Sequence, residues 1–286
     1  MPTLAPDSAE AKAIDASLSM WRQGDLALDE RWFIHAGDSS QPLTVASAEA
    51  RESGIQAFTT EVAGLAVVSQ TCDVVRKCGE RPYVEVAPLV KVDVKDMLPI
   101  QRGYRPALAT LPVLLAESCA IDLDRVMTVE KSIVATWKRT AGCASDNESR
   151  AFAQALARKR ARFAFPDDFA ELADRLQQRL SDKHQKNSDE GRALRALREI
   201  RVHAAPSWDA TPVAIFFWFI RNDADATFEG RNWANLLASW LKLIKAAGRF
   251  AAVDGQVVTL EDLTGADYVN SDPLDLDHLS NRGLAE

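Results

Sequence analysis

The hydrophobic pattern of the chain is most distinctive between residues 64 and 90. Residues 64–68 form an uninterrupted apolar run rich in valine, which indicates a strand that is buried on both faces. The polar or reactive residues 69–73 follow it directly, and a second apolar run begins at Tyr83. Because Pro88 cannot donate a ladder hydrogen bond, we expect the second strand to stop there, at an edge or a bulge. The pattern predicts two short strands with a polar tip on the first.

Short segments of similar character lie on both sides of this pair. We expect an N-terminal helix at residues 7–21. Further short strands are expected at residues 24–28, 31–34, 113–116 and 126–129. Residues 43–60 show no clear period and are left open. Frequent short strands with turn signals between them favour a small barrel or a strongly bent sheet.

Longer helical periods mark the second half of the chain. We expect a helix over residues 149–162 that ends in a basic cluster, and another that begins after Pro166 and carries an apolar stripe. Residues 231–247 form the clearest amphipathic helix, with tryptophans on its apolar side. The basic cluster is typical of a phosphate contact or of a salt-bridged surface.

Strand signals and a change of composition complete the predicted organisation. Residues 213–220 fit a central strand, and Asp254-Gly255 predicts the turn of a hairpin. The small, polar residues 140–149 are the expected domain boundary. We therefore predict an α+β protein of three parts: an N-terminal helix, residues 1–21; a β-rich, barrel-like domain, residues 22–140; and an α+β domain with an acidic C-terminal tail, residues 149–286.

Composition and charge limit the classes of protein to consider. Of 286 residues, 47% are hydrophobic and 26% are charged, which is ordinary for a globular protein that buries its own core. No apolar run is long enough to span a membrane, and the acidic N-terminus does not resemble a signal peptide. Four scattered cysteines then indicate reduced thiols and a cytoplasmic location. The net charge of -7 argues against binding to nucleic acid without sequence preference.

The polar tip is the strongest candidate for chemistry. Cys72 and Asp73 are the candidate catalytic residues, and the candidate ligand-binding residues are Ser69, Gln70, Thr71, Arg76, Lys77 and Arg81. A nucleophilic cysteine usually needs a histidine base, and all four histidines are distant in sequence. The neighbouring aspartate disfavours the thiolate. A polar cluster that binds a ligand, or a turn whose side chains cap their own backbone, is the alternative.

No metal site or cofactor is predicted. Cys72 and Cys78 are separated by five residues, which is not a zinc spacing, and no dinucleotide or phosphate-loop motif is present. Asp275, Asp277 and His278 could bind a cation, but a solvated strand with alternating acidic residues is the favoured explanation.

Several short motifs together resemble the MazF/PemK toxin family. They are Gly24-Asp25, the valine strand ending at Ser69, Arg81-Pro82, and the strand around Ala87-Pro88. The resemblance implies an SH3-like barrel within residues 22–135 and a bacterial mRNA interferase or a relative of one. The Arg-Pro follows the valine strand instead of preceding it, so no catalytic residues are carried over.

Two main hypotheses of function follow. The first is a bacterial toxin- or defence-type protein that binds RNA or DNA near the tip and, if it is an enzyme, hydrolyses a phosphodiester. The alternative is a non-enzymatic adaptor that binds a partner protein through its C-terminal domain, by the acidic tail and the tryptophan-bearing helix. An antitoxin partner and homo-oligomers are compatible with the first hypothesis, and a Cys72-dependent enzyme is a third idea.

Overall fold

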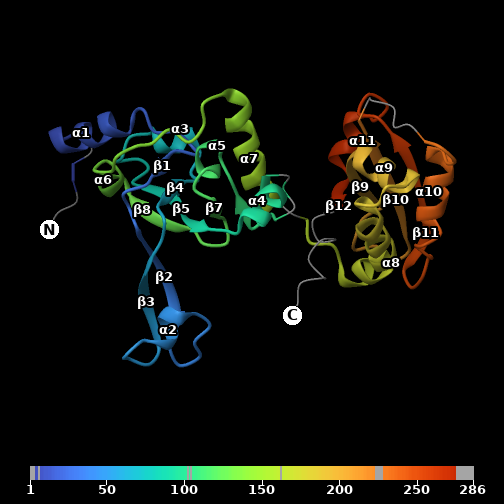
Figure 1. Ribbon diagram of the computed structural model, residues 1–286, viewed down its shortest axis with the longest axis horizontal. Helices are drawn as coiled ribbons and strands as arrows, with labels where there is room; N and C mark the ends of the chain where they lie inside the picture. Colours follow the sequence, from blue (N-terminus) through green and yellow to red (C-terminus); the bar gives the residue numbers. More distant parts are fainter. Residues whose placement is uncertain are drawn as a thin grey trace. The chain divides into compact units, whose positions relative to one another are not determined.

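The computed structural model describes residues 4–5, 7–101, 103, 105–161, 163–222 and 228–274. The chain forms two compact units, Met1–Ala161 and Arg162–Glu286, and each is described by itself (Figure 1). Helices and strands both contribute, in several sheets, which confirms the predicted α+β class.

The first unit is built on an antiparallel sheet with short helices between its strands. Its elements in chain order are α1 (Ala9–Leu18), β1 (Leu26–Ala27), β2 (Trp32–Asp38), α2 (Val45–Ala48), β3 (Ile55–Glu61), β4 (Leu65–Val67), α3 (Thr71–Val74), β5 (Tyr83–Lys91), α4 (Val94–Gln101), β6 (Leu108–Ala109), α5 (Pro112–Leu115), β7 (Cys119–Asp122), β8 (Met127–Glu130), α6 (Lys131–Val134) and α7 (Asp146–Arg160). The sheet has the order β1-β4-β5-β7-β6, and β8 also pairs with β5. The SH3-like barrel remains a prediction.

The two central strands lie where the sequence placed them, but β5 does not stop at Pro88. It continues to Lys91, and Pro88 lies opposite Leu65 of β4. The Leu89 N–H donates to the Gly64 carbonyl on the β4 side, so the Pro88 nitrogen faces the other side of the strand. On that side β8 pairs only as far as Val86 and β7 pairs only from Leu89. The missing donor therefore falls in the gap between two partner strands, and the prediction of a strand end was wrong.

The boundary between the two units differs from the predicted one because α7 belongs to the first unit. Phe152 and Leu156 of α7 are buried in a cluster with Leu26 of β1 and Ala66 of β4. The division between the units consequently lies after Ala161, not within residues 140–149. Apolar burial by α7 holds it against the sheet.

A second correction concerns residues 113–116, which were predicted to form a strand. They belong to α5, whose first residue is Pro112 and whose Leu114 is buried while Val113 is exposed. Proline suits the first turn of a helix because its missing N–H would have no intrahelical partner there. The four-residue apolar run was too short for periodicity to separate helix from strand.

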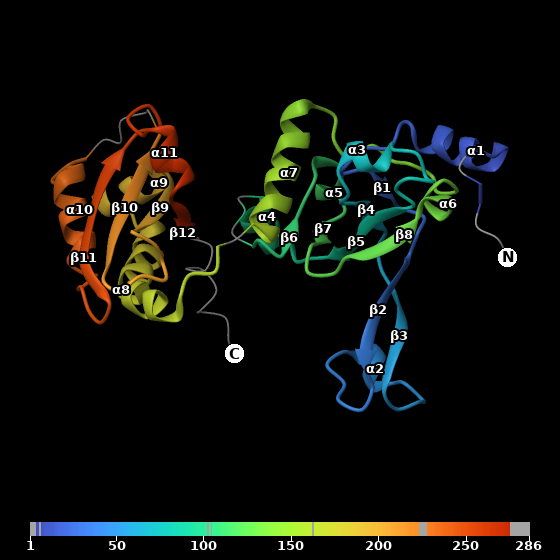
Figure 2. The ribbon, with the colours of Figure 1, turned by 180° about the vertical axis from the view of Figure 1, so that it is seen from behind.

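Residues 43–60, whose sequence pattern predicted no element, belong to a two-stranded arm, β2–β3. β2 and β3 pair with each other only, and α2 lies between them in sequence. Both views show the arm leaving the body of the first unit with α2 at its far end (Figures 1 and 2). Leu43, Val45 and Ile55 at this end are largely exposed. An isolated two-stranded ribbon is marginally stable, so the arm depends on contacts at its base.

His35 of β2 packs among aromatic rings in the arm. Its ring lies between Phe33 and Phe58, with ring centroids 6.3 and 5.8 Å away, and both ring nitrogens are buried without a hydrogen-bond partner. We expect His35→Phe to stabilise the arm by about 1 kcal/mol, because it removes buried polar atoms that have no partner. Amide hydrogen exchange in β2 and β3 should then slow by about fivefold.

The matched control for this change is Thr59→Val. Thr59 is exposed on the arm, so the change should leave exchange in β2 and β3 nearly unaltered. Equal exchange rates in His35→Phe and wild-type protein would contradict the prediction.

The second unit is a mixed sheet with helices packed on both faces. Its elements are α8 (Asp167–His184), α9 (Asp189–Ala196), β9 (Leu197–Ala205), β10 (Val213–Arg221), α10 (Trp233–Leu241), β11 (Phe250–Val258), α11 (Gly265–Val269) and β12 (Asp272–Leu274). The strand order is β11-β10-β9-β12. β10 is parallel to β11 and antiparallel to β9. β10 is thus the central strand that residues 213–220 predicted.

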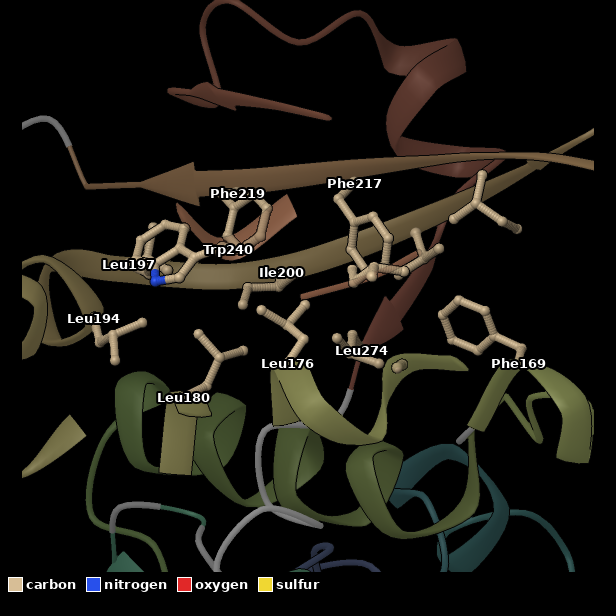
Figure 3. Packing of buried hydrophobic residues seen from close by; sticks show 14 of the residues in the cluster. Phe169, Leu176, Leu180, Leu194, Leu197, Ile200, Phe217, Phe219, Trp240 and Leu274 are labelled. Carbon is tan, nitrogen blue, oxygen red and sulfur yellow. The ribbon is translucent and has the colours of Figure 1, made fainter. Parts of the chain in front are cut away.

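The core of the second unit lies between the sheet and its helices. Figure 3 shows Phe217 and Phe219 of β10 facing Leu176 of α8, with Trp240 beside Phe219. The rings of Phe219 and Trp240 have centroids 4.8 Å apart, and the Trp240 N–H donates to the Glu190 carboxylate. The apolar side of the tryptophan-bearing helix is therefore used to close the core.

The predicted hairpin at Asp254-Gly255 does not exist. These residues lie in the middle of one continuous strand, β11, where Gly255 is opposite Phe217 of β10. A Cβ on Gly255 would lie 2.8 Å from the Phe217 carbonyl oxygen, so the glycine permits close approach of the two strands. Asp-Gly is a common turn pair, but here the glycine allows two strands to pack closely and no turn forms.

No helix in the described part of the chain combines the length and apolar character that crossing a membrane requires. The N-terminal helix predicted over residues 7–21 is confirmed as α1, with the Ser8 hydroxyl accepting the Ala11 N–H.

Candidate functional site

The polar tip is held tightly to the sheet by its own side chains. The N–H groups of Val68 and Ser69 both lie within hydrogen-bond distance of the Glu85 carbonyl, at 3.0 and 3.3 Å. The Ser69 hydroxyl accepts the Glu85 N–H at 2.7 Å, and the Thr71 hydroxyl accepts the Gln23 N–H at 3.1 Å. Ser69 and Thr71 therefore position the tip, while Gln70 is exposed beside them.

Cys72 and Asp73 lie in the short helix α3 that begins the tip's return. Cys72 is exposed, and its thiol donates to the Gln70 side-chain oxygen at 3.6 Å. The only histidine in the first unit's sequence is His35, which is stacked in the arm. The Asp73 carboxylate makes no hydrogen bond or ion pair with the residues that the structure describes. Cys72 thus has no imidazole base within this unit, and Asp73 is available to a ligand.

A buried lysine holds the tip from below. Lys131, at the start of α6, has 1% of its surface exposed. Its ammonium donates to the Asp73 carbonyl at 2.8 Å and to the Arg76 carbonyl at 2.6 Å. Burial lowers the pKa of Lys131, and the nearby carboxylates, Asp15 first among them, act in the opposite direction. The ammonium therefore hydrogen-bonds to carbonyl groups in and just after the last turn of α3, which have no N–H partner within the helix.

The loop after the tip carries three cations without ion-pair partners among the described residues. Arg76, Lys77 and Arg81 are exposed and lie within six residues of one another. The basic end of α7 contrasts with them: Lys159 pairs with Asp124 and Arg160 pairs with Glu85. Of these two basic segments, the loop of residues 76–81 is the one with unpaired cations, and the salt-bridged interpretation applies to Lys159 and Arg160.

A second ionic feature beside the tip was missed at the sequence level. Asp25 is 2% exposed, and its carboxylate accepts the Arg139 guanidinium N–H at 2.6 Å and the Arg22 N–H at 2.7 Å. Gly142 packs directly on the Gly24 carbonyl, leaving no room for a Cβ. The Gly24-Asp25 motif could have pointed to this position, but nothing in the sequence identified Arg139 as its partner.

A hollow of the first unit lies away from the tip. It has a volume of 360 Å³ and is lined by residues of α4, β6, α5 and α7, including Gln101, Thr110 and Arg158. None of the candidate site residues lines it. The hollow and the tip are therefore separate features of the unit.

The described residues contain no cluster of three potential metal ligands. Cys72 is exposed, whereas Cys78 is turned toward α1: the Cys78 N–H donates to Asp15 and the thiol to the Ala11 carbonyl. Burial, followed by Asp15, raises the pKa of the Cys78 thiol. Asp275, Asp277 and His278 lie outside the described residues.

Comparison with known proteins gives no family for the chain. No protein-family model matches it, and no curated protein matches it significantly. The MazF/PemK resemblance accordingly stays a prediction, and function has to be argued from the site.

Proposed function

We propose that the first unit binds a single-stranded nucleic acid at the tip and the loop of residues 76–81, as a bacterial toxin- or defence-type protein. The unpaired cations Arg76, Lys77 and Arg81 carry this proposal. Exposed cations that have no internal partner are available to neutralise phosphates and release counterions. The tip itself, held by Lys131 and Ser69, supplies a rigid surface beside them.

Binding is better supported than cleavage. Hydrolysis of a phosphodiester needs a group that activates water or a nucleophile. Asp73 is the one candidate base beside Cys72 in the described tip, and its carboxylate is free. We therefore assign Asp73, and not the Cys72 thiol, as the group to test for hydrolysis.

Salt-dependent binding tests the proposal. A fluorescently labelled single-stranded RNA and its DNA equivalent should bind the full chain with an affinity that falls as salt rises. Replacing Arg76, Lys77 and Arg81 together by alanine should reduce the slope of log affinity against log salt by about two, at about 0.7 per lost phosphate contact. The matched control replaces Arg31, Arg51 and Arg150, which are equally exposed and unpaired in the described unit.

The outcomes separate binding from cleavage. Equal slopes in the two triple variants would refute binding at the loop. Growth arrest and fragmentation of total RNA on induction in a bacterial host, abolished by Asp73→Ala but not by Cys72→Ala, would support hydrolysis through Asp73. Intact RNA together with salt-dependent binding would leave a binding protein.

The adaptor alternative loses the surface first expected to carry it. The tryptophan-bearing helix is α10, and Trp240 and Leu236 are fully buried in the core of the second unit. The acidic tail was predicted over residues 263–286; its first part forms α11 and β12, and residues 275–286 lie outside the described part. A partner protein would need another surface of the second unit.

A further inference from the structure

β11 is an edge strand of the second unit's sheet, and α10 packs beside it. It pairs with β10 on one side, and no strand of the described chain pairs with its other side (Figure 2). The strand is nine residues long and contains neither proline nor lysine. Proteins commonly protect exposed edges with these residues, with bulges or with short strands. Apart from one irregularity at Val213/Ala214, the β10–β11 register is continuous. β11 is consequently a template for a further strand.

Backbone donors of β11 face outward. The Gly255 N–H donates to the Asp254 carboxylate at 2.8 Å instead of to β10. Since N–H groups along a strand alternate between its two sides, the N–H groups of Val253 and Val257 also point away from β10. These donors are the ones that an added strand would use.

Every charged residue within β11 and the segment that follows it to Leu274 is acidic. Cations lie at the ends of the strand: Arg249, directly before β11, pairs with Asp168, and Arg221 is near Asp262. Between Phe250 and Leu274 the chain has no lysine or arginine, and its charged residues are Asp254, Glu261, Asp262, Asp267 and Asp272. Asp254 is exposed in the middle of β11. Asp262, just beyond the strand, accepts the Thr259 N–H and hydroxyl, which lowers the pKa of its carboxyl group. A complementary ligand is therefore cationic.

An aromatic pair lies next to the edge on the sheet face opposite α8. Phe216 and Trp218 of β10 have ring centroids 4.4 Å apart, and both side chains are partly exposed. Phe216 is opposite Asp254 in the register, and the neighbouring β11 position on this face is the small residue Ala252. A long cationic side chain that crosses Ala252 can lie over the Phe216 ring, which attracts cations.

We propose that the outer edge of β11 binds an extended segment of a partner protein, rich in lysine or arginine, as a fifth strand of the sheet. Main-chain hydrogen bonds to the outward amides supply affinity, and Asp254 with Phe216 selects cationic side chains at alternate positions. This site is in the second unit and is independent of nucleic-acid binding by the first. It gives the adaptor hypothesis a surface other than α10.

Two matched peptides test the proposal on the full chain. One alternates lysine and valine over the length of β11, and the other has glutamate in place of lysine. Fluorescence anisotropy should show binding of the lysine peptide that is at least about tenfold tighter than binding of the glutamate peptide. In an isotope-labelled sample, the lysine peptide should slow amide exchange at Val253, Gly255 and Val257.

A pair of charge reversals locates the contact. Asp254→Lys should weaken the lysine peptide by about tenfold or more, while Asp182→Lys, an exposed position on α8, should leave its affinity unchanged. Equal affinity for the two peptides, no binding, or equal losses in both variants would overturn the proposal. So would binding without slower exchange in β11. Concentration-dependent protection of β11 without any peptide would identify a second copy of the chain as the occupant instead.

Discussion

Asp25→Ala should destabilise the first unit by about 2–3 kcal/mol, because the partly buried Arg139 guanidinium then loses its carboxylate partner. The Asp25 carboxylate also accepts backbone N–H groups from Arg22 and, at 3.4 Å, from Gly142. Those donors lose their acceptor in the same change. Urea unfolding, monitored by hydrogen exchange in peptides from β1, β4 and β5, measures the loss of stability in this unit separately from the second unit.

The control for Asp25 is Asp29→Ala. Asp29 is exposed nearby and makes no contact of this kind in the described chain, so its loss should cost less than about 0.5 kcal/mol. Replacing Asp25 and Arg139 together by apolar residues should recover part of the loss, since no unpaired charge remains. If the single Asp25 and Asp29 changes had equal effects, the ion pair would not support the unit.

Lys131→Met should reduce the free energy of unfolding of the first unit by about 3 kcal/mol. Methionine keeps much of the buried stem but leaves the Asp73 and Arg76 carbonyls without the ammonium, and hydrogen bonds to charged groups contribute about 1.5–3 kcal/mol each, offset by the desolvation of the lysine. Amide exchange in α3 should accelerate more than exchange in β7.

Lys138→Met gives the comparison for Lys131. Lys138 follows α6 and is exposed, so its substitution should change neither stability nor exchange in α3. A Lys131→Met protein with wild-type exchange in α3 would show that the tip does not need the ammonium. It would also remove the argument that the tip is a rigid surface.

Patterns confined to a few neighbouring residues predicted much of the fold. The valine run at residues 64–68, the proline-aspartate start of α8 and the apolar run at residues 213–220 each contain their own signal of burial or capping. They succeeded because burial or capping requires the same residues wherever the element packs.

The failures occurred where a distant segment determined the local structure. Asp254-Gly255 has turn chemistry, but the opposing Phe217 carbonyl explains the glycine. Pro88 would end a strand with one continuous partner, and here the partner changes from β8 to β7 at that point. Pairing and register across the sheet cannot be read from one segment.

The candidate site divides in the same way. The sequence placed the tip at residues 69–73 and the cations beside it, because both are contiguous in the chain. It did not identify Lys131, which contacts Asp73 from 58 residues away, or Arg139, which contacts Asp25 from 114 residues away. Each is a single basic residue without a local pattern, and only the fold brings it to its partner.

The strand pairing in the body of the first unit does not depend on the arm. β1 and β4 are adjacent antiparallel strands, with Leu26 opposite Ala66, so the arm is an insertion between two strands that already pair. Its two ends meet at the base, where the Val62 N–H donates to the Arg31 carbonyl at 3.1 Å. Phe33 and Val62 belong to the core and anchor that base. Sequence beyond them can lengthen, shorten or diverge between lineages at little entropic cost to the body, so the arm is where an evolving chain of this fold can acquire new contacts.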